Sequence, residues 1–114
     1  MSGDICLQCR DGVDKLDHLL RNHPAETADE LTEAVRCAVA VRDRMIERRR
    51  RGGSDPRRDA RLRQVNAVIS AIVAGEFPLM GIRWQRIEGA RDLLRKVLRE
   101  EEAEAAASAD RRPA

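Results

Sequence analysis

The sequence predicts an all-α protein, an antiparallel up-down-up-down four-helix bundle that is a monomer or a dimer with one shared core. Aromatic residues make up only 2% of the 114 residues, and Ala, Arg, Glu and Leu dominate, which favours helix over strand. Apolar residues also recur every three or four positions in four segments that Pro- or Gly-containing breaks separate. We expect one domain over residues 1–107 and a disordered tail over residues 108–114.

The first helix is predicted over residues 4–21. Gly12 lies inside this segment and costs about 1 kcal/mol relative to Ala, so frayed or absent first turns are expected. Pro24 ends the segment, because proline disfavours helical backbone in the residue before it. One apolar stripe runs along the helix, consisting of Ile5, Cys9, Val13, Leu16 and Leu20.

The second helix is predicted over residues 24–50. Its first part is acidic and its last part, Arg48–Arg51, is basic, so both ends complement the helix dipole. Folding the first two helices back on each other at His23 places their apolar stripes in register and brings Cys9 opposite Cys37.

A Gly-Gly-Ser-Asp-Pro break separates the second helix from the third. Gly52 or Gly53 can end the second helix, since glycine adopts the left-handed conformation that often follows a helix. Ser54 or Asp55 can cap the third helix, which we predict over residues 56–74.

The fourth helix is predicted over residues 81–106. The turn before it, residues 76–81, is unusually apolar for a surface connection. This turn either folds inward as a lid on the core, which we favour, or forms an exposed docking patch. In the second case the partner-binding residues are Phe77, Pro78, Leu79, Met80 and Trp84.

An arginine-rich region spans the end of the second helix and the start of the third, although the net charge of the chain is only +2. An up-down bundle brings Glu100–Glu104 of the fourth helix to the same pole, so we favour internal ion pairing or simple solvation. The alternatives are an acidic protein partner, or nucleic acid or another polyanion held by phosphate contacts. No aromatic residue is present there to stack a base. The candidate polyanion-binding residues are Arg48, Arg49, Arg50, Arg51, Arg57, Arg58 and Arg61.

The cysteines raise a metal hypothesis. Cys6 and Cys9 form a C-x-x-C pair followed by His18 and His23, which resembles part of a Cys2His2 zinc finger. The Cys-to-His interval is shorter than in such fingers, and the interior aromatic residue is missing. If the first segment is helical, Cys6, Cys9 and Cys37 gather instead at one height, where zinc or a thiol switch is conceivable with His18 as a further ligand. We favour buried, reduced thiols.

The segment from His18 to Arg21 carries one further likeness. It resembles the histidine motif of histidine phosphotransfer domains, four-helix bundles in which an exposed histidine is followed by Leu, then Lys and Gly. Here Arg21 stands in for the lysine and Asn22 for the glycine. The resemblance implies phosphorylation of His18, but the interpretation we favour is an exposed helix histidine.

No catalytic constellation appears in the sequence, such as a Gly-rich phosphate loop, a nucleophile elbow or repeated Glu-x-x-His, so we expect no enzyme activity and no cofactor. No apolar run follows Met1, and the apolar residues 65–84 are interrupted by Gly and Pro, so neither a secretory signal nor a membrane span is expected. We therefore expect a cytoplasmic, bacterial-type adaptor, regulator or assembly factor that binds a protein partner and self-associates as a homo-oligomer.

Overall fold

The computed structural model describes residues 2–22, 28–76 and 83–110, and the secondary structure in these ranges is entirely α-helical. No strand occurs within them, which confirms the predicted all-α class with four helices. The helices are α1 (Ser2–Asn22), α2 (Ala28–Gly52), α3 (Pro56–Glu76) and α4 (Trp84–Asp110).

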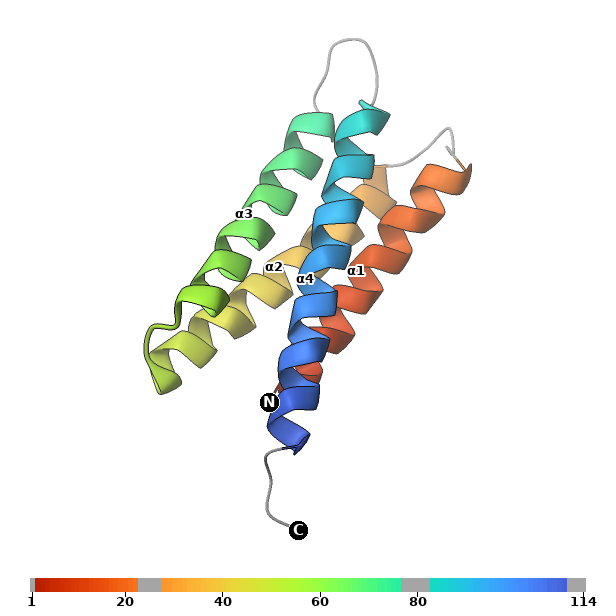
Figure 1. The fold of residues 1–114 in the computed structure, drawn as a ribbon. Coiled ribbons are helices and arrows are strands. Elements are labelled where there is room, and N and C mark those ends of the chain that lie inside the picture. Colours follow the sequence, from red (N-terminus) through yellow and green to blue (C-terminus); the bar gives the residue numbers. More distant parts are fainter. Residues whose placement is uncertain (1, 23–27, 77–82, 111–114) are drawn as a thin grey trace.

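Each helix packs against two others. Both α1 and α3 contact α2 and α4 (Figure 1), so the four helices surround one core. Ion pairs join Arg10 to Glu102 and Asp17 to Arg91, so residue numbers rise along α1 as they fall along the adjacent part of α4. The largest fully buried aliphatic side chains are Ile5, Leu16, Leu19, Leu31, Val41, Val65, Val68, Ile72, Ile87, Leu94 and Val97.

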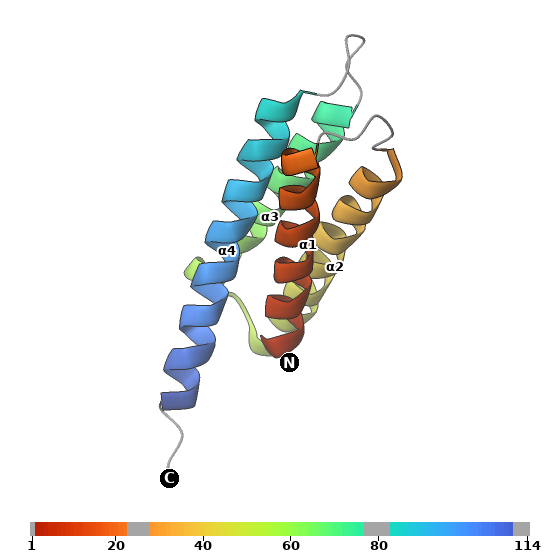
Figure 2. The same ribbon diagram turned by 90° about the vertical axis from the view of Figure 1, so that its right-hand side faces the viewer.

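Figures 1 and 2 show that the start of α1, the turn between α2 and α3, and the end of α4 lie at the same end of the molecule. We call this end the arginine pole, because the seven arginines singled out above lie on the helix ends that meet there. None of the helices in the described ranges combines the length and the apolar character needed to cross a bilayer.

The turn between α2 and α3 follows the predicted chemistry. Gly53 has a φ of 83°, in the left-handed region, and its amide donates to the carbonyl of Arg49 at 2.8 Å. The Oδ1 atom of Asp55 accepts hydrogen bonds from the amides of Arg57 and Arg58 at 2.9 and 3.1 Å. Asp55 is therefore the N-cap of α3, and Gly53 ends α2.

The helix ends differ from expectation mainly in α4. This helix continues to Asp110, beyond residue 107, where the domain was expected to end. The sequence after Glu102 is rich in alanine, the strongest helix former, which explains the extension into the expected tail. The expected starts of the second helix at residue 24 and of the fourth at residue 81, and the tail residues 111–114, lie outside the described residues.

Gly12 has a packing role that the sequence did not reveal. The first turns of α1 are helical, and Gly12 is buried in the middle of the helix. A Cβ atom placed on it would lie 2.8 Å from Cδ2 of Leu94 and 3.4 Å from Cβ of Cys37. The missing side chain therefore allows α1 to approach α2 and α4 closely.

Substituting this glycine by alanine tests the close approach. Gly12→Ala should lower the free energy of unfolding by roughly 1–3 kcal/mol, because Leu94 is fully buried and has little room to move. Gly89→Ala is the matched control, because Gly89 is exposed in α4 and its Cβ would meet nothing within 4 Å. The control should raise stability by up to about 1 kcal/mol. Denaturant unfolding of the full chain gives both values, and equal shifts in the two variants would contradict the packing role.

Candidate functional site

A cluster of three arginines and two glutamates holds α2, α3 and α4 together at the arginine pole. The guanidinium of Arg48 in α2 donates two hydrogen bonds of 2.8 Å each to the carboxylate of Glu101. Arg61 of α3 donates from Nε to Glu101 at 2.8 Å and from Nη2 to Glu104 at 2.6 Å. Arg58 adds two bonds from Nε to Glu104 at 3.1 and 3.2 Å. We call these five residues the Arg–Glu cluster.

Burial makes this cluster unlike an ordinary surface ion pair. The side chain of Glu101 is 0% exposed and that of Arg61 is 4% exposed. Burial alone would raise the pKa of Glu104, but the hydrogen bonds from Arg58 and Arg61 outweigh it and lower that pKa. Burial likewise opposes the charge of Arg61, yet its bonds to the two carboxylates raise its pKa. Glu104 and Arg61 therefore stay ionised near neutral pH.

The predicted polyanion-binding arginines fall into two groups. Arg48, Arg58 and Arg61 already bind carboxylates in the cluster, as internal pairing predicted. The others lie nearer the surface, where Arg49 pairs with Asp59 at 3.7 Å, while Arg50 and Arg51 pair with Glu47 at 3.6 and 3.2 Å. Arg57 is exposed at the start of α3.

A pocket of about 440 Å³ opens beside the cluster, and we call it the arginine pocket. It carries four guanidinium groups and one carboxylate. Its lining residues are Ile5 from α1, Arg44, Glu47, Arg48, Arg51 and Gly52 from α2, and Arg58 from α3.

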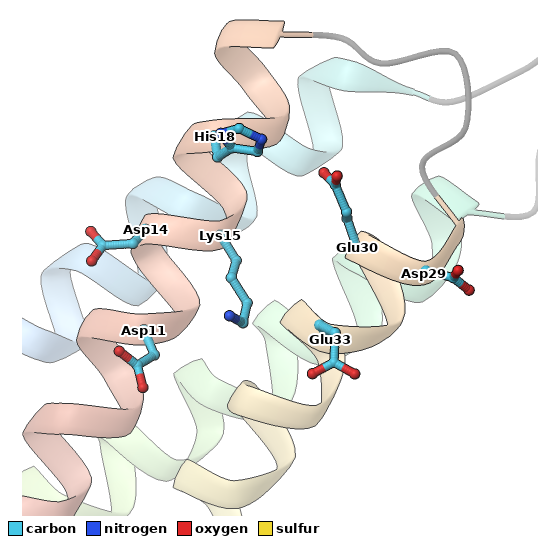
Figure 3. A pocket seen from close by; sticks show the side chains of 7 residues that line it. All are labelled: Asp11, Asp14, Lys15, His18, Asp29, Glu30 and Glu33. Carbon is cyan, nitrogen blue, oxygen red and sulfur yellow. The ribbon is translucent and has the colours of Figure 1, made fainter.

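A second concave site lies between α1 and α2 near the other end of the molecule, and we call it the acidic groove (Figure 3). Its volume is about 520 Å³. In Figure 3, Glu30 of α2 projects into the space between the helices, and its Oε2 atom is buried without a hydrogen-bond donor among the described residues. The groove is lined by Asp11, Asp14, Lys15 and His18 from α1 and by Asp29, Glu30 and Glu33 from α2.

His18 is exposed, as the sequence analysis favoured, and belongs to this groove. The side-chain amide of Asn22 donates to the backbone carbonyl of His18 at 2.9 Å and lies 3.0 Å from its Nδ1 atom. Five carboxylates surround the groove, so its negative potential opposes the approach of an anionic phosphoryl donor. Phosphotransfer therefore remains only a resemblance.

The three thiols do not gather at one height. Cys37 lies beside Gly12, one helical turn beyond the position that would put it opposite Cys9. Burial, followed by the charge of Glu101, raises the pKa of Cys9 to about 12, and burial also raises the pKa of Cys6 and Cys37. Metal ligation and thiol exchange both need the thiolate, which these surroundings disfavour. Within the described ranges, no three His, Cys, Asp or Glu residues are placed to hold a metal ion.

The predicted partner site is described only at Trp84. The residues Phe77, Pro78, Leu79 and Met80 lie outside the described ranges. Trp84 is half-buried and packs against the core.

The structure shows an apolar surface between α2 and α3 that the sequence analysis missed. Ile46 of α2 is 41% exposed and Val73 of α3 is 38% exposed. In each helix the apolar residues of this surface are spaced four and seven apart, because Arg42 and Asn66 interrupt the rows, so their periodicity is weaker than that of the inward stripes. We call it the α2/α3 apolar surface, and it consists of Val35, Val39 and Ile46 from α2 and Leu62, Ile69 and Val73 from α3.

The register of α2 against α3 places these residues opposite one another. Arg49 pairs with Asp59, and counting in opposite directions from that pair sets Ile46 against Leu62 and Val35 against Val73. Val35, Leu62 and Ile69 are partly buried against the core, while Ile46 and Val73 stand further out.

Comparisons of the chain with protein-family models, with curated proteins and with solved structures find no match.

Removing one charge from the Arg–Glu cluster tests its contribution. Glu101→Gln keeps the shape of the side chain but leaves the buried guanidinium of Arg61 and the partly buried one of Arg48 without their carboxylate, so the free energy of unfolding should fall by roughly 3–5 kcal/mol. The matched control is Glu102→Gln, whose carboxylate makes an exposed pair with Arg10 at 3.0 Å and should change stability by less than about 1 kcal/mol. Denaturant unfolding measures both, and equal effects would contradict the buried cluster.

The lowered pKa of Glu104 predicts an acid-sensitive contribution to stability. A carboxyl group whose folded pKa lies below its unfolded pKa stabilises the protein at neutral pH, and this contribution is lost as pH falls from about 4.5 through the folded pKa. The difference in stability between wild type and Glu104→Gln should therefore shrink as the pH falls from about 5 to about 2. The thermal unfolding midpoints of both proteins across this range give the measurement, and a constant difference would contradict the expectation.

Proposed function

We propose that this chain is a small, non-catalytic protein–protein interaction module of the cytoplasm, built as an antiparallel up-down-up-down bundle that self-associates. The observation that carries the proposal is the α2/α3 apolar surface, where Ile46 of α2 and Val73 of α3 remain exposed. Exposed apolar residues that gather on one surface are typical of docking sites, whereas scattered single ones need no explanation.

The arrangement of this surface favours a helical partner. One apolar row runs along α2 and another along α3. The polar residue Arg42 interrupts the first row, and Asn66 interrupts the second. A third helix laid along these rows can bury an apolar stripe of the same spacing, as in other helix-in-groove interactions. The partner that fits is therefore an amphipathic helix of another protein, with a polar or acidic residue near its middle to meet Arg42.

The apolar sequence Phe77–Met80 follows α3 in the chain and lies outside the described residues. Partner binding by this turn stays a separate part of the proposal. The three cysteines are all free thiols, which supports a reducing compartment.

Charge placed on the apolar surface should abolish partner binding without unfolding the protein. Full-length wild type, Ile46→Asp and Val73→Asp are used to capture proteins from native cell extract, and proteins lost in both variants are purified and titrated directly. We expect at least tenfold weaker binding for each variant, because an aspartate at the centre of an apolar contact must be desolvated.

The matched control is Ala67→Asp, which adds the same charge at an exposed position of α3 outside the apolar row. It should bind like wild type. Circular dichroism and thermal unfolding confirm that all variants stay folded. If the captured protein binds Ile46→Asp and Val73→Asp as tightly as wild type, this surface is not the docking site.

A further inference from the structure

The acidic groove and the arginine pocket both lie along the side of α2 that is turned toward α1, and their arrangement is self-complementary. We propose that the α1/α2 face pairs with the same face of a second copy of this chain about a two-fold axis, so that each acidic groove meets the partner copy's arginine pocket. This inference rests on the self-association in the proposed function and names the surface responsible. A two-fold interface of this kind uses the same patch on both copies and makes every contact twice.

The geometry of α2 places the two sites in line. An α-helix repeats its orientation after five turns, which take 18 residues and rise about 27 Å. Glu33 in the groove and Arg51 in the pocket are separated by this interval, and so are Glu30 and Arg48. The two sites therefore occupy one side of α2, the side turned toward α1.

An exposed leucine marks the middle of this face. Leu7 is 53% exposed and is the most exposed large apolar residue among those described. It continues the α1 stripe of Asp11, Asp14 and His18 at helical spacing, so it lies on the groove side of α1. Counting along both helices from the contact of Gly12 with Cys37 puts Leu7 level with residue 42 of α2, midway between the two charged sites.

This midpoint is where a two-fold axis must pass if each charged site is to meet its opposite. Leu7 would then pack against its own counterpart near the axis, with an acidic–basic contact on either side. Apolar contacts at the centre of an interface and charged contacts at its rim are the usual arrangement of protein interfaces.

The groups available for the charged contacts are exposed and extended. Arg48 and Arg58 of the pocket are engaged with Glu101 and Glu104, so the group that can reach outward is Arg51, whose guanidinium stands at the surface beside Glu47. On the acidic side, the carboxylate of Glu33 stands at the surface beside Arg36 of the same helix. Arg51 of the second copy is the group that meets this carboxylate.

The helix dipole accounts for part of the charge pattern, because acidic residues favour the start of a helix and basic residues its end. It does not account for Asp11 and Asp14, which lie in the middle of α1 and extend the acidic site across to a second helix. Nor does it account for an exposed leucine between the two sites. The self-complementary face explains all three features together.

The test uses charge reversal in the full-length protein, with the molecular mass followed by sedimentation over a range of protein concentrations. Glu33→Arg and Arg51→Glu each turn two attractive contacts of the dimer into repulsive ones, so each variant alone should dimerise at least about tenfold more weakly than wild type. In an equimolar mixture of the two variants, every contact again joins opposite charges, and the heterodimer should form with near wild-type affinity. Arg63→Glu, an exposed reversal on α3, is the control and should leave the dimer unchanged.

Salt and apolar substitutions complete the experiment. Raising the ionic strength from about 0.05 M to about 0.5 M should weaken the wild-type dimer, because screening shortens the reach of exposed charges. Leu7→Asp, which brings two like charges together at the axis, should dissociate it.

Three outcomes overturn the inference. A wild type that is monomeric at low salt and high protein concentration removes self-association from the proposed function as well, and leaves only binding to a different protein. A dimer that survives both charge reversals but is lost in Ile46→Asp keeps self-association and moves it to the α2/α3 apolar surface. A mixture that stays monomeric when both variants are monomeric excludes the antiparallel pairing of groove and pocket.

Discussion

The carboxylate of Glu101 is the group on which the arginine pole depends. It is removed from solvent and receives guanidinium groups from both α2 and α3, so one side chain of α4 joins three helices. A charge in such a place costs several kcal/mol to desolvate, and only a complete set of partners offsets that cost. Glu104 and Arg58 extend the set outward to water. The cluster therefore contributes little when a partner is removed, and it favours the arrangement of the helices in which both carboxylates keep their guanidinium partners.

The shape of the molecule explains why charged residues occupy a position that aliphatic ones would fill elsewhere. Figure 1 shows α3 and α4 diverging toward the arginine pole, whereas they run close together at the other end. Leucine and valine side chains are too short to bridge such a separation, but arginine can span it and cover apolar surface with its methylene stem. The five-residue cluster thus closes the core at its wide end. The same residues are consequently less available to bind a polyanion than their number in the sequence suggests.

The amphipathic periodicity and the breaks were sufficient to predict four helices and a cap at Ser54 or Asp55, of which the structure shows Asp55. The expected meeting of arginines with Glu100–Glu104 correctly favoured internal pairing. The alignment of Cys9 with Cys37 was wrong, because two periodic stripes can slide past each other by a turn and still match. Which glutamate is buried could not be predicted either. Glu101 and Glu102 are adjacent and chemically the same, and a rotation of about 100° on the helix decides that one enters the core and the other pairs with Arg10 at the surface.

The same rotational argument links the buried cluster to the outer surfaces. α2 presents three different sides: an apolar one to the core, a charged one toward α1, and a second apolar one toward α3. These sides are separated by rotation about a single axis, so one orientation of the helix determines all of them. The bidentate hydrogen bonding of Arg48 to Glu101 determines that orientation near the end of α2. Turning the helix by one residue would move the guanidinium about 100° away from its carboxylate. A buried ion pair that adds little net stability can in this way decide which side chains of α2 lie at the surface.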